Sequence, residues 1–401
     1  MCVKRPRAAS KAVTWEQPPR AATRTSRTAA FLAVVLVAVV LGAVVSRQRT
    51  TPPLGELQVD RRPSVTPTTE TAAWRALRIG VWRELPIAPL APRVAHHMVR
   101  VGRRVFVWGG FDVAGRPLSD GGLFDPADGT WQPVAAVDTR GSPGYATRFD
   151  GDVLVVSTAA TQRYDPSDNR WYAEAALPRQ RGYTLTDQRA EVGDGVAVVR
   201  RPTTDRDGRP AVFMLRPGDA AWRRLPDPPV RFTDGDVLLG HPTRLTIVTR
   251  AQAGRPAAGF SINPNRADAR WRRTELPPHL ENRPLARLFG AHIGVRSVLV
   301  GIGAPGQPGY AAAHDGQRWR DAAPPPLSVS PLTEALWIGG GMILWNPVTA
   351  TGARLDLSAA RWARLPPAPV ADGAPRPAAW NGSSVVTWGG FTATGAVYRI
   401  R

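Results

Sequence analysis

The sequence has little of the residues from which several common functional sites are built. Among its 401 residues Cys2 is the single cysteine, which excludes an intrachain disulfide, a thiolate zinc cluster and a paired redox site. No glycine-rich phosphate loop and no regular spacing of metal ligands is present. The six histidines are scattered, and we expect no metal and no other cofactor.

Lysine is almost absent, and basic charge is carried by arginine. Lys4 and Lys11 are the two lysines among 52 basic residues, which face 32 acidic residues and leave a formal net charge of +20. Arginine in place of lysine is typical of a GC-rich genome, so the net charge receives little weight here. We expect no nucleic-acid partner.

One long apolar run is present near the N-terminus. Residues 29–46 carry no charge and, as a helix, are just long enough to cross a bilayer. The basic residues before the run outnumber those after it, so the positive-inside rule predicts a cytoplasmic tail over 1–28, a single transmembrane helix over 29–46 and an extracytoplasmic remainder. The alternative is a signal peptide cleaved near Ser46, which would release a secreted protein.

Proline and glycine are abundant, with 40 and 38 residues, and they predict many turns rather than long helices. Residues 47–73 are rich in Pro and Thr and read as an extended stalk. We expect the folded unit to cover 74–401 and to be a monomer.

The folded unit repeats. Seven tryptophans stand in similar local sequences, 40 to 51 residues apart, which is the period of propeller blades. They are Trp82, Trp131, Trp171, Trp222, Trp271, Trp319 and Trp362. A second tryptophan follows 26 residues after three of them, at Trp108, Trp345 and Trp388. Asp-Gly and Asn-Gly pairs between short apolar runs predict β-hairpins within each repeat.

The repeat resembles the kelch repeat. The resemblance rests on the Gly109-Gly110 and Gly389-Gly390 doublets after hydrophobic strands, on the aromatic-Asp-Pro turns at 124–126 and 164–166, and on a Trp about six residues after such an Asp. It covers roughly 74–401, although the doublet is replaced in the middle repeats. The resemblance implies an all-β, seven-bladed propeller of four-stranded blades.

The last repeat lacks its fourth strand, whereas Trp82 stands at the start of the unit without three strands before it. We therefore predict that the strand around 79–85 joins the last blade and closes the ring, which removes two exposed sheet edges. The alternative is six blades with frayed ends.

Six arginines precede the predicted innermost strands, 9 to 14 residues after the blade tryptophans. They are Arg93, Arg140, Arg181, Arg231, Arg283 and Arg376. Guanidinium groups suit carboxylates and phosphates, so these arginines are the candidate binding residues, with a structural role as the alternative. Adjacent His96 and His97 would point to opposite faces of a strand, which favours a structural role for both.

No catalytic residue is assigned. Four carboxylates, Asp234, Asp236, Glu281 and Glu334, are interpreted as solvated loop charges. A kelch-type galactose oxidase is excluded, because Cys2 lies before the apolar run. The sequence therefore favours a membrane-anchored binding module for an acidic protein or an envelope polymer. The alternative is an extracytoplasmic carbohydrate-active enzyme similar to a sialic acid epimerase.

Overall fold

The computed structural model describes residues 79–400, apart from 138–143, 158–159, 180, 182, 204–208, 253, 305–306, 328–329, 331 and 371. The predicted cytoplasmic tail, apolar segment and stalk lie outside the described residues. The described chain consists of strands and turns, and no helix that could cross a membrane is found in it.

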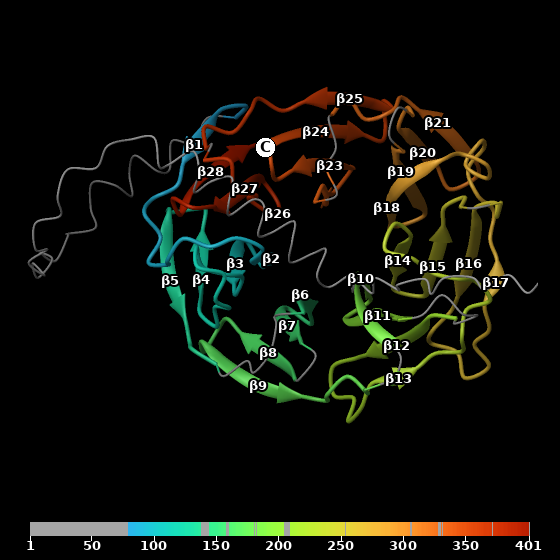
Figure 1. Ribbon diagram of the computed structural model, residues 1–401, viewed down its shortest axis with the longest axis horizontal. Coiled ribbons are helices and arrows are strands. Elements are labelled where there is room, and N and C mark those ends of the chain that lie inside the picture. The colour runs from blue at the N-terminus through green and yellow to red at the C-terminus, as the bar shows by residue number, and fades with distance from the viewer. Residues whose placement is uncertain are drawn as a thin grey trace, which may run out of the picture. The chain divides into compact units, whose positions relative to one another are not determined.

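Seven antiparallel sheets of four strands are arranged in a ring (Figure 1). Blade 1 contains β2 (His97–Val101), β3 (Arg104–Trp108), β4 (Gly121–Asp125) and β5 (Thr130–Val134). Blade 2 contains β6 (Tyr145–Phe149), β7 (Asp152–Val156), β8 (Thr161–Asp165) and β9 (Arg170–Glu174). Blade 3 contains β10 (Tyr183–Val192), β11 (Gly195–Pro202), β12 (Ala211–Leu215) and β13 (Arg223–Arg224).

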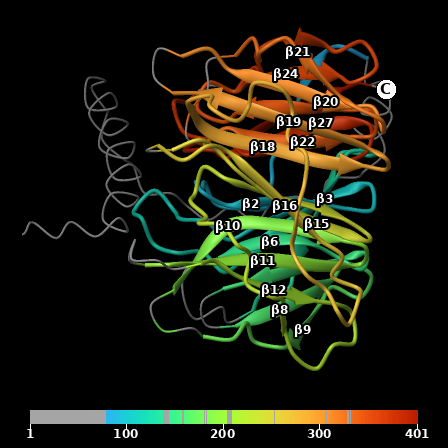
Figure 2. The same ribbon diagram turned by 90° about the vertical axis from the view of Figure 1, so that its right-hand side faces the viewer.

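Blade 4 contains β14 (Val237–His241), β15 (Arg244–Thr249), β16 (Ala258–Ile262) and β17 (Arg272–Arg273). Blade 5 contains β18 (Leu285–Ile293), β19 (Arg296–Gly303), β20 (Tyr310–His314) and β21 (Trp319–Ala322). Blade 6 contains β22 (Glu334–Ile338), β23 (Gly341–Asn346), β24 (Thr351–Asp356) and β25 (Arg361–Arg364). In Figure 2 the strands β18 to β21 follow one another from the centre of the ring to its edge.

Blade 7 joins the two ends of the described chain. It contains β26 (Ala378–Trp380), β27 (Ser384–Gly389), β28 (Thr394–Arg399) and, as its outer strand, β1 (Trp82–Glu84). Trp82 pairs with Tyr398 in this sheet, and β1 lies beside β28 in Figure 1. The predicted seven-bladed ring, closed by the N-terminal strand, is therefore confirmed.

The hairpin turns use the residues that the sequence indicated. Asp150 and Gly151 both have positive φ, 48° and 85°, as a two-residue type I′ turn requires. At the last inner hairpin the Asn381 side chain accepts hydrogen bonds from the backbone N–H groups of Ser383 and Ser384, at 3.0 and 2.7 Å. These turns hold the innermost strand of a blade against the second strand.

The hydrophobic core is divided among the seams between blades. Each seam holds one apolar cluster to which both neighbouring sheets contribute. Between blades 1 and 2, for example, Val99 and Trp108 pack with Val153 and Tyr164. Burial of these side chains fixes each blade against the next one, because no single sheet can cover both of its faces.

The outer tryptophans add a repeated hydrogen bond. In six of the seven seams the outer tryptophan of one blade donates its indole N–H to a backbone carbonyl of the preceding blade. The accepting residue lies four positions after that blade's own outer tryptophan. The six pairs are Trp82 with Pro366, Trp131 with Pro86, Trp171 with Ala135, Trp222 with Ala175, Trp271 with Pro226 and Trp362 with Ala323. The bond from Trp82 to Pro366 follows the same rule across the closure, so the closing seam is built like the others.

Candidate functional site

Two of the six predicted binding arginines are buried inside their own blades. Arg93 and Arg376 are each 1% exposed. The Arg93 guanidinium donates to the carbonyl oxygens of Gly109 and Asp120 and pairs with the Asp120 carboxylate at 2.9 Å. The guanidinium of Arg376 donates to the Gly389 carbonyl in the same manner. Both arginines therefore hold the glycine doublet of a blade, which supports the structural alternative for these two residues.

The other predicted arginines lie in different surroundings. The side chains of Arg181 and Arg231 are exposed, and Arg283 is half-buried with its guanidinium 5.3 Å from the centre of the Tyr310 ring. Arg140 lies outside the described residues. The six arginines thus do not share one environment, and their spacing in the sequence reflects the blade repeat.

Charged side chains do converge near the axis, on other residues. Arg189 lies on β10, after an irregularity in the register between Leu185 and Arg189. Its guanidinium stands 5.3 Å from the centre of the Tyr145 ring on β6, and its charge lowers the pKa of His97 on β2. These innermost strands belong to blades 1, 2 and 3. An arginine that acts on all three lies close to the axis of the ring.

The same arginine acts on a carboxylate from the opposite side of the ring. Glu334 begins β22 in blade 6, and burial raises its pKa to about 7. The backbone N–H of Ala378, 3.1 Å from Oε2, and the charges of Arg189 and Arg287 oppose this rise. We call Tyr145, Arg189, Arg287 and Glu334, together with His97, the axial cluster.

Several buried polar atoms in or beside this cluster have no partner within the described chain. They are the Tyr145 hydroxyl, His97 Nε2 and Arg200 Nε. Burial raises the pKa of Tyr145, and burial together with Arg189 lowers the pKa of His97 to about 3. The tyrosine therefore stays a phenol and the histidine stays neutral at physiological pH. Such unpaired groups are rare in folded proteins and are typical of sites that hold water or a ligand.

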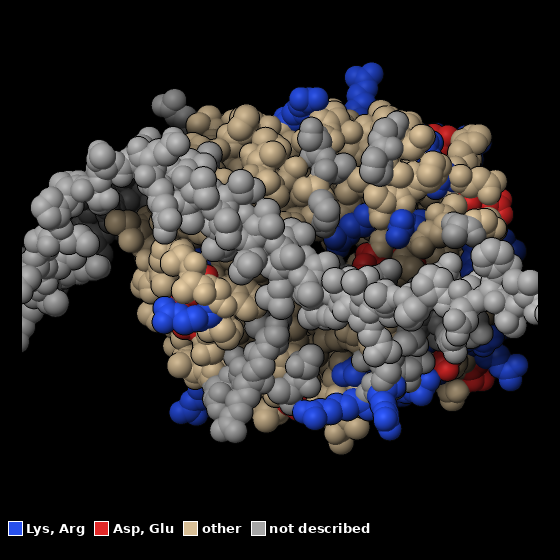
Figure 3. All heavy atoms as spheres, viewed as in Figure 1, with Lys and Arg blue, Asp and Glu red and all other residues tan. Residues whose placement is uncertain are grey.

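The cluster is suited to holding an anion. The charges of Arg189 and Arg287 both act on Glu334, and guanidinium groups of this kind bind carboxylates and phosphates. Figure 3 shows basic and acidic atoms beside a hollow near the centre of the described face. His97 is a poor general base, because a group with a pKa of about 3 is hardly protonated at neutral pH.

The sequence indicated this cluster only in part. Glu334 was interpreted as a solvated loop charge, and the structure corrects this, because it lies half-buried on an inner strand. Asp236 is likewise buried, and its carboxylate accepts the N–H groups of Thr233 and Arg250. Arg189 was missed, because its position follows from a strand irregularity that the sequence does not reveal.

His96 and His97 are separated as expected. His96 precedes β2, is 4% exposed, and meets the Trp388 ring edge-on at 5.5 Å, whereas His97 belongs to the axial cluster. A Cβ added at Gly389 would lie 2.3 Å from the His96 ring. The structural role predicted for His96 agrees with this packing. No group of three or more metal-binding side chains occurs among the described residues.

The described strands define a seven-bladed β-propeller of four-stranded blades. No protein-family model matches the chain. Beta-scruin from Limulus polyphemus is 26% identical over 130 residues, a match that covers 29% of this chain and only 14% of beta-scruin. The solved structure described as "Structure of YjhT" is 13% identical, with a TM-score of 0.48, and the alignment covers 70% of this chain and 99% of that one.

Proposed function

We propose that the chain is a non-catalytic binding propeller, held outside the membrane by residues 29–46, whose ligand is an acidic protein segment or an anionic envelope polymer. The observation that carries the proposal is the convergence of Arg189 and Arg287 on the axis, where five blades contribute to the axial cluster. A concave site with low-dielectric walls concentrates the field of these charges and attracts anions.

The ligand chemistry follows from the arginines. A guanidinium binds a carboxylate or a phosphate through two parallel hydrogen bonds, and it keeps its charge at every physiological pH. The neutral His97 and Tyr145 add hydrogen-bonding groups without adding charge. An extended acidic segment that enters at the axis would meet both kinds of group.

An acid–base enzyme that acts on a sugar is the second candidate, and Glu334 favours it. A carboxyl group with a pKa of about 7 can both donate and accept a proton at neutral pH. Proton transfer on two sides of a substrate needs a second titratable group, and His97 is held neutral. Turnover of a sugar that is lost in Glu334→Gln, while sugar binding is kept, would establish this candidate.

The binding proposal is tested with a fluorescent pentaglutamate peptide and the full chain in detergent. Arg189→Gln combined with Arg287→Gln should weaken binding about tenfold or more, and high salt should weaken wild-type binding. Arg361→Gln is the matched control, because it removes the same kind of charge from an exposed position on β25. Equal affinity in the double variant and the control, with folding intact, would overturn the axial site.

The membrane anchor is tested separately. Protease added to intact cells should digest the propeller and leave the N-terminal tail protected. Mature protein in the culture medium, with a new N-terminus near residue 47, would establish the cleaved signal peptide instead.

A further inference from the structure

A cavity lies between blades 4 and 5, and none of the residues of the axial cluster lines it. It has a volume of about 770 Å³ and is lined by all four strands of both blades, close to the 241–244 and 293–296 hairpins. Cavities of this size are typical of small-molecule sites. We call it the seam cleft and define it by Arg244, Thr246, His292, Ser297 and Trp319, with Arg272 at its rim.

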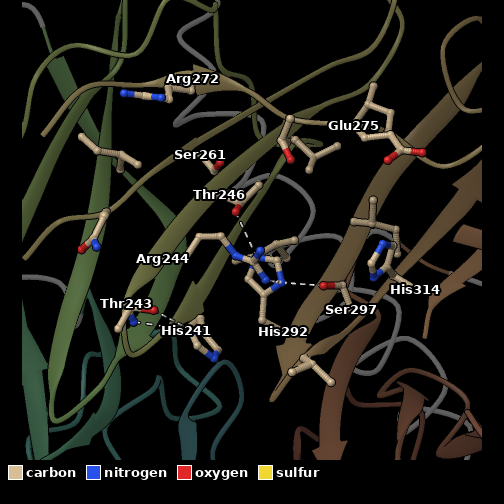
Figure 4. Close-up of a pocket in the computed structure, with 18 of the residues that line it drawn as sticks. His241, Thr243, Arg244, Thr246, Ser261, Arg272, Glu275, His292, Ser297 and His314 are labelled. Atoms are coloured by element: carbon tan, nitrogen blue, oxygen red, sulfur yellow. Dashed lines mark hydrogen bonds between the residues drawn. The ribbon is translucent and has the colours of Figure 1, made fainter. Parts of the chain in front are cut away.

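His292 bridges the two blades inside the cleft (Figure 4). Its Nε2 lies 3.0 Å from the Thr246 hydroxyl of blade 4, and its Nδ1 lies 2.7 Å from the Ser297 hydroxyl of blade 5. Arg244 reaches the same Nδ1 at 3.3 Å. Since the arginine can only donate, Nδ1 is the acceptor and the proton resides on Nε2.

The hydrogen bonds of His292 do not make it a catalytic base. Burial, with the charge of Arg244 as the next cause, lowers the pKa of His292 to about 3. A histidine with so low a pKa cannot take a proton from Ser297 at neutral pH, so the Ser297–His292 pair is not an activated nucleophile. In the cleft His292 is therefore a fixed hydrogen-bonding group rather than a general base.

Arg244 has no carboxylate partner in the described part of the chain. It is half-buried, its Nε has no hydrogen-bond partner, and no carboxylate pairs with it within the described chain. By contrast, half-buried Arg163 on β8 pairs with both Asp152 and Glu174. A bound anion would give the Arg244 guanidinium a counter-charge inside the cleft.

Trp319 is the exception among the outer tryptophans. In the described part of the chain its indole N–H makes none of the seam bonds that the other six make. The ring lines the cleft and meets the edge of His314 at 5.2 Å. Its N–H is thus left for a ligand, and its apolar surface can cover the flat face of one.

The remaining lining is rich in hydroxyl groups and has basic charge at the rim. Thr243, Thr246, Ser261, Thr274 and Ser297 contribute hydroxyls. Arg270 and Arg272 are exposed at the rim and form no ion pair with described residues, whereas Arg266 pairs with Asp268 at 2.8 Å. In Figure 4 Arg272 and Glu275 lie at the end of the cleft opposite His241.

We infer that the seam cleft is a second binding site and that its ligand is an acidic saccharide, with a carboxylate on Arg244 and Arg272 and a sugar ring against Trp319. Many small hydroxyl and imidazole groups suit a ligand that carries hydroxyls, and the unpaired guanidinium groups suit its carboxylates. An acidic peptide and a nucleotide also carry anionic groups that suit a guanidinium, and binding measurements with both separate them from an acidic saccharide.

The test measures binding of tetragalacturonate to the full chain by calorimetry. Its fully methyl-esterified form is the neutral control, and pentaglutamate and ATP represent acidic peptides and nucleotides. Arg244→Gln and Arg272→Gln should each weaken tetragalacturonate binding about tenfold, and Trp319→Phe should weaken it severalfold because the indole N–H is lost. The ester should not bind.

Two controls locate the site. Arg361→Gln removes a surface charge elsewhere, and Arg189→Gln with Arg287→Gln alters the axial cluster; neither should change tetragalacturonate binding. The inference is overturned if tetragalacturonate does not bind, if only the axial variant weakens it, or if pentaglutamate or ATP competes for the cleft with higher affinity. If pentaglutamate does not bind at the axial cluster of the wild-type protein, the proposed function is wrong, but the inference about the seam cleft is unaffected.

Discussion

The seams on either side of the ring closure differ from the seam between blades 4 and 5. Near the closure, the outer tryptophan of one blade meets a second-strand tryptophan of the preceding blade. The ring centres are 5.8 Å apart for Trp82 and Trp345, 5.7 Å for Trp131 and Trp388, and 4.6 Å for Trp171 and Trp108. Between blades 4 and 5, Trp319 meets no such partner, and Val248 stands at the register position of those tryptophans.

The same repeat therefore forms tightly packed seams in one part of the ring and a seam with a cavity in another. Three aromatic seams hold the blades around the closure, where the sheet is completed by strands from both ends of the folded unit. The strands β7, β11 and β19 also carry no tryptophan, but the seam between blades 4 and 5 differs in its cavity and in the Trp319 N–H, which makes no seam bond. The seam between blades 4 and 5 keeps an apolar cluster of its own beside the cleft, and burial of this cluster holds the two blades together.

Deletion of residues 74–85 should have the largest effect on the aromatic side of this comparison. It removes β1 and the Trp82 ring that packs on Trp345 and Tyr398, and it exposes an edge of blade 7. Trp82 is half-buried, so loss of its side chain alone should cost less than the about 3–5 kcal/mol typical of a fully buried aromatic residue, but the deletion also removes a whole strand and should reach at least that range. Chemical denaturation measures this cost, and an unchanged midpoint would refute ring closure by β1.

A smaller effect is expected at Glu334 in the axial cluster. Its folded-state pKa of about 7 lies above the ordinary value of 4.5, so the folded protein holds a proton that the unfolded chain has released. Wild-type stability should therefore fall as the pH rises from about 4.5 to about 7, by up to about 3 kcal/mol, and stay low above that range.

Glu334→Gln removes this ionisation and should unfold at higher denaturant than wild type above about pH 7, with no such gain below about pH 4.5. The arginines that face Glu334, Arg189 and Arg287, are unchanged in this variant. A stability difference between variant and wild type that is the same at both ends of the pH range would show that Glu334 does not titrate as described.

The smallest effect is expected from loss of a single tryptophan hydrogen bond, compared between Trp222 and Trp319. Trp222→Phe removes the bond from the indole to the Ala175 carbonyl, 2.7 Å long, and should cost about 1–2 kcal/mol. Trp319→Phe keeps the ring and removes an N–H that has no partner in the described seam, so its cost should be near zero. Thermal unfolding of both variants checks this, and equal losses would mean that Trp319 is a seam tryptophan like the others.

Much of the fold could be predicted because the propeller repeats. The tryptophan period, the Asp150-Gly151 turn and the strand missing from the last repeat each reflect local chemistry that a single sequence displays. Ring closure followed from counting strands. The buried roles of Arg93 and Arg376 were foreseen only as an alternative, because an arginine that holds a glycine doublet and one that awaits a ligand have the same position in the repeat.

The sites could not be predicted, because they are assembled across blades. The axial cluster joins side chains more than a hundred residues apart, such as Arg189 and Glu334. The seam cleft combines Trp319, whose indole N–H makes no seam bond, with Arg244, which forms no ion pair in the described part of the chain. A sequence shows which residues are present, and it does not show which of them lack a partner in the fold.

One comparison of two arginines tests most directly whether the seam cleft is a binding site rather than part of the packing. Arg376 is fully buried and paired with Asp372 at 2.8 Å, so Arg376→Leu should cost about 3–5 kcal/mol. Arg244 has no carboxylate partner in the described chain, and His292 keeps its bond to Ser297 without it.

The measurement is the melting temperature of Arg244→Leu, read together with its binding of tetragalacturonate. We predict a melting temperature equal to or above that of wild type and a loss of binding, since the variant removes an uncompensated charge that the ligand would have neutralised. A melting temperature that falls as far as that of Arg376→Leu, with tetragalacturonate binding retained, would contradict the account and make Arg244 a structural residue of the ring.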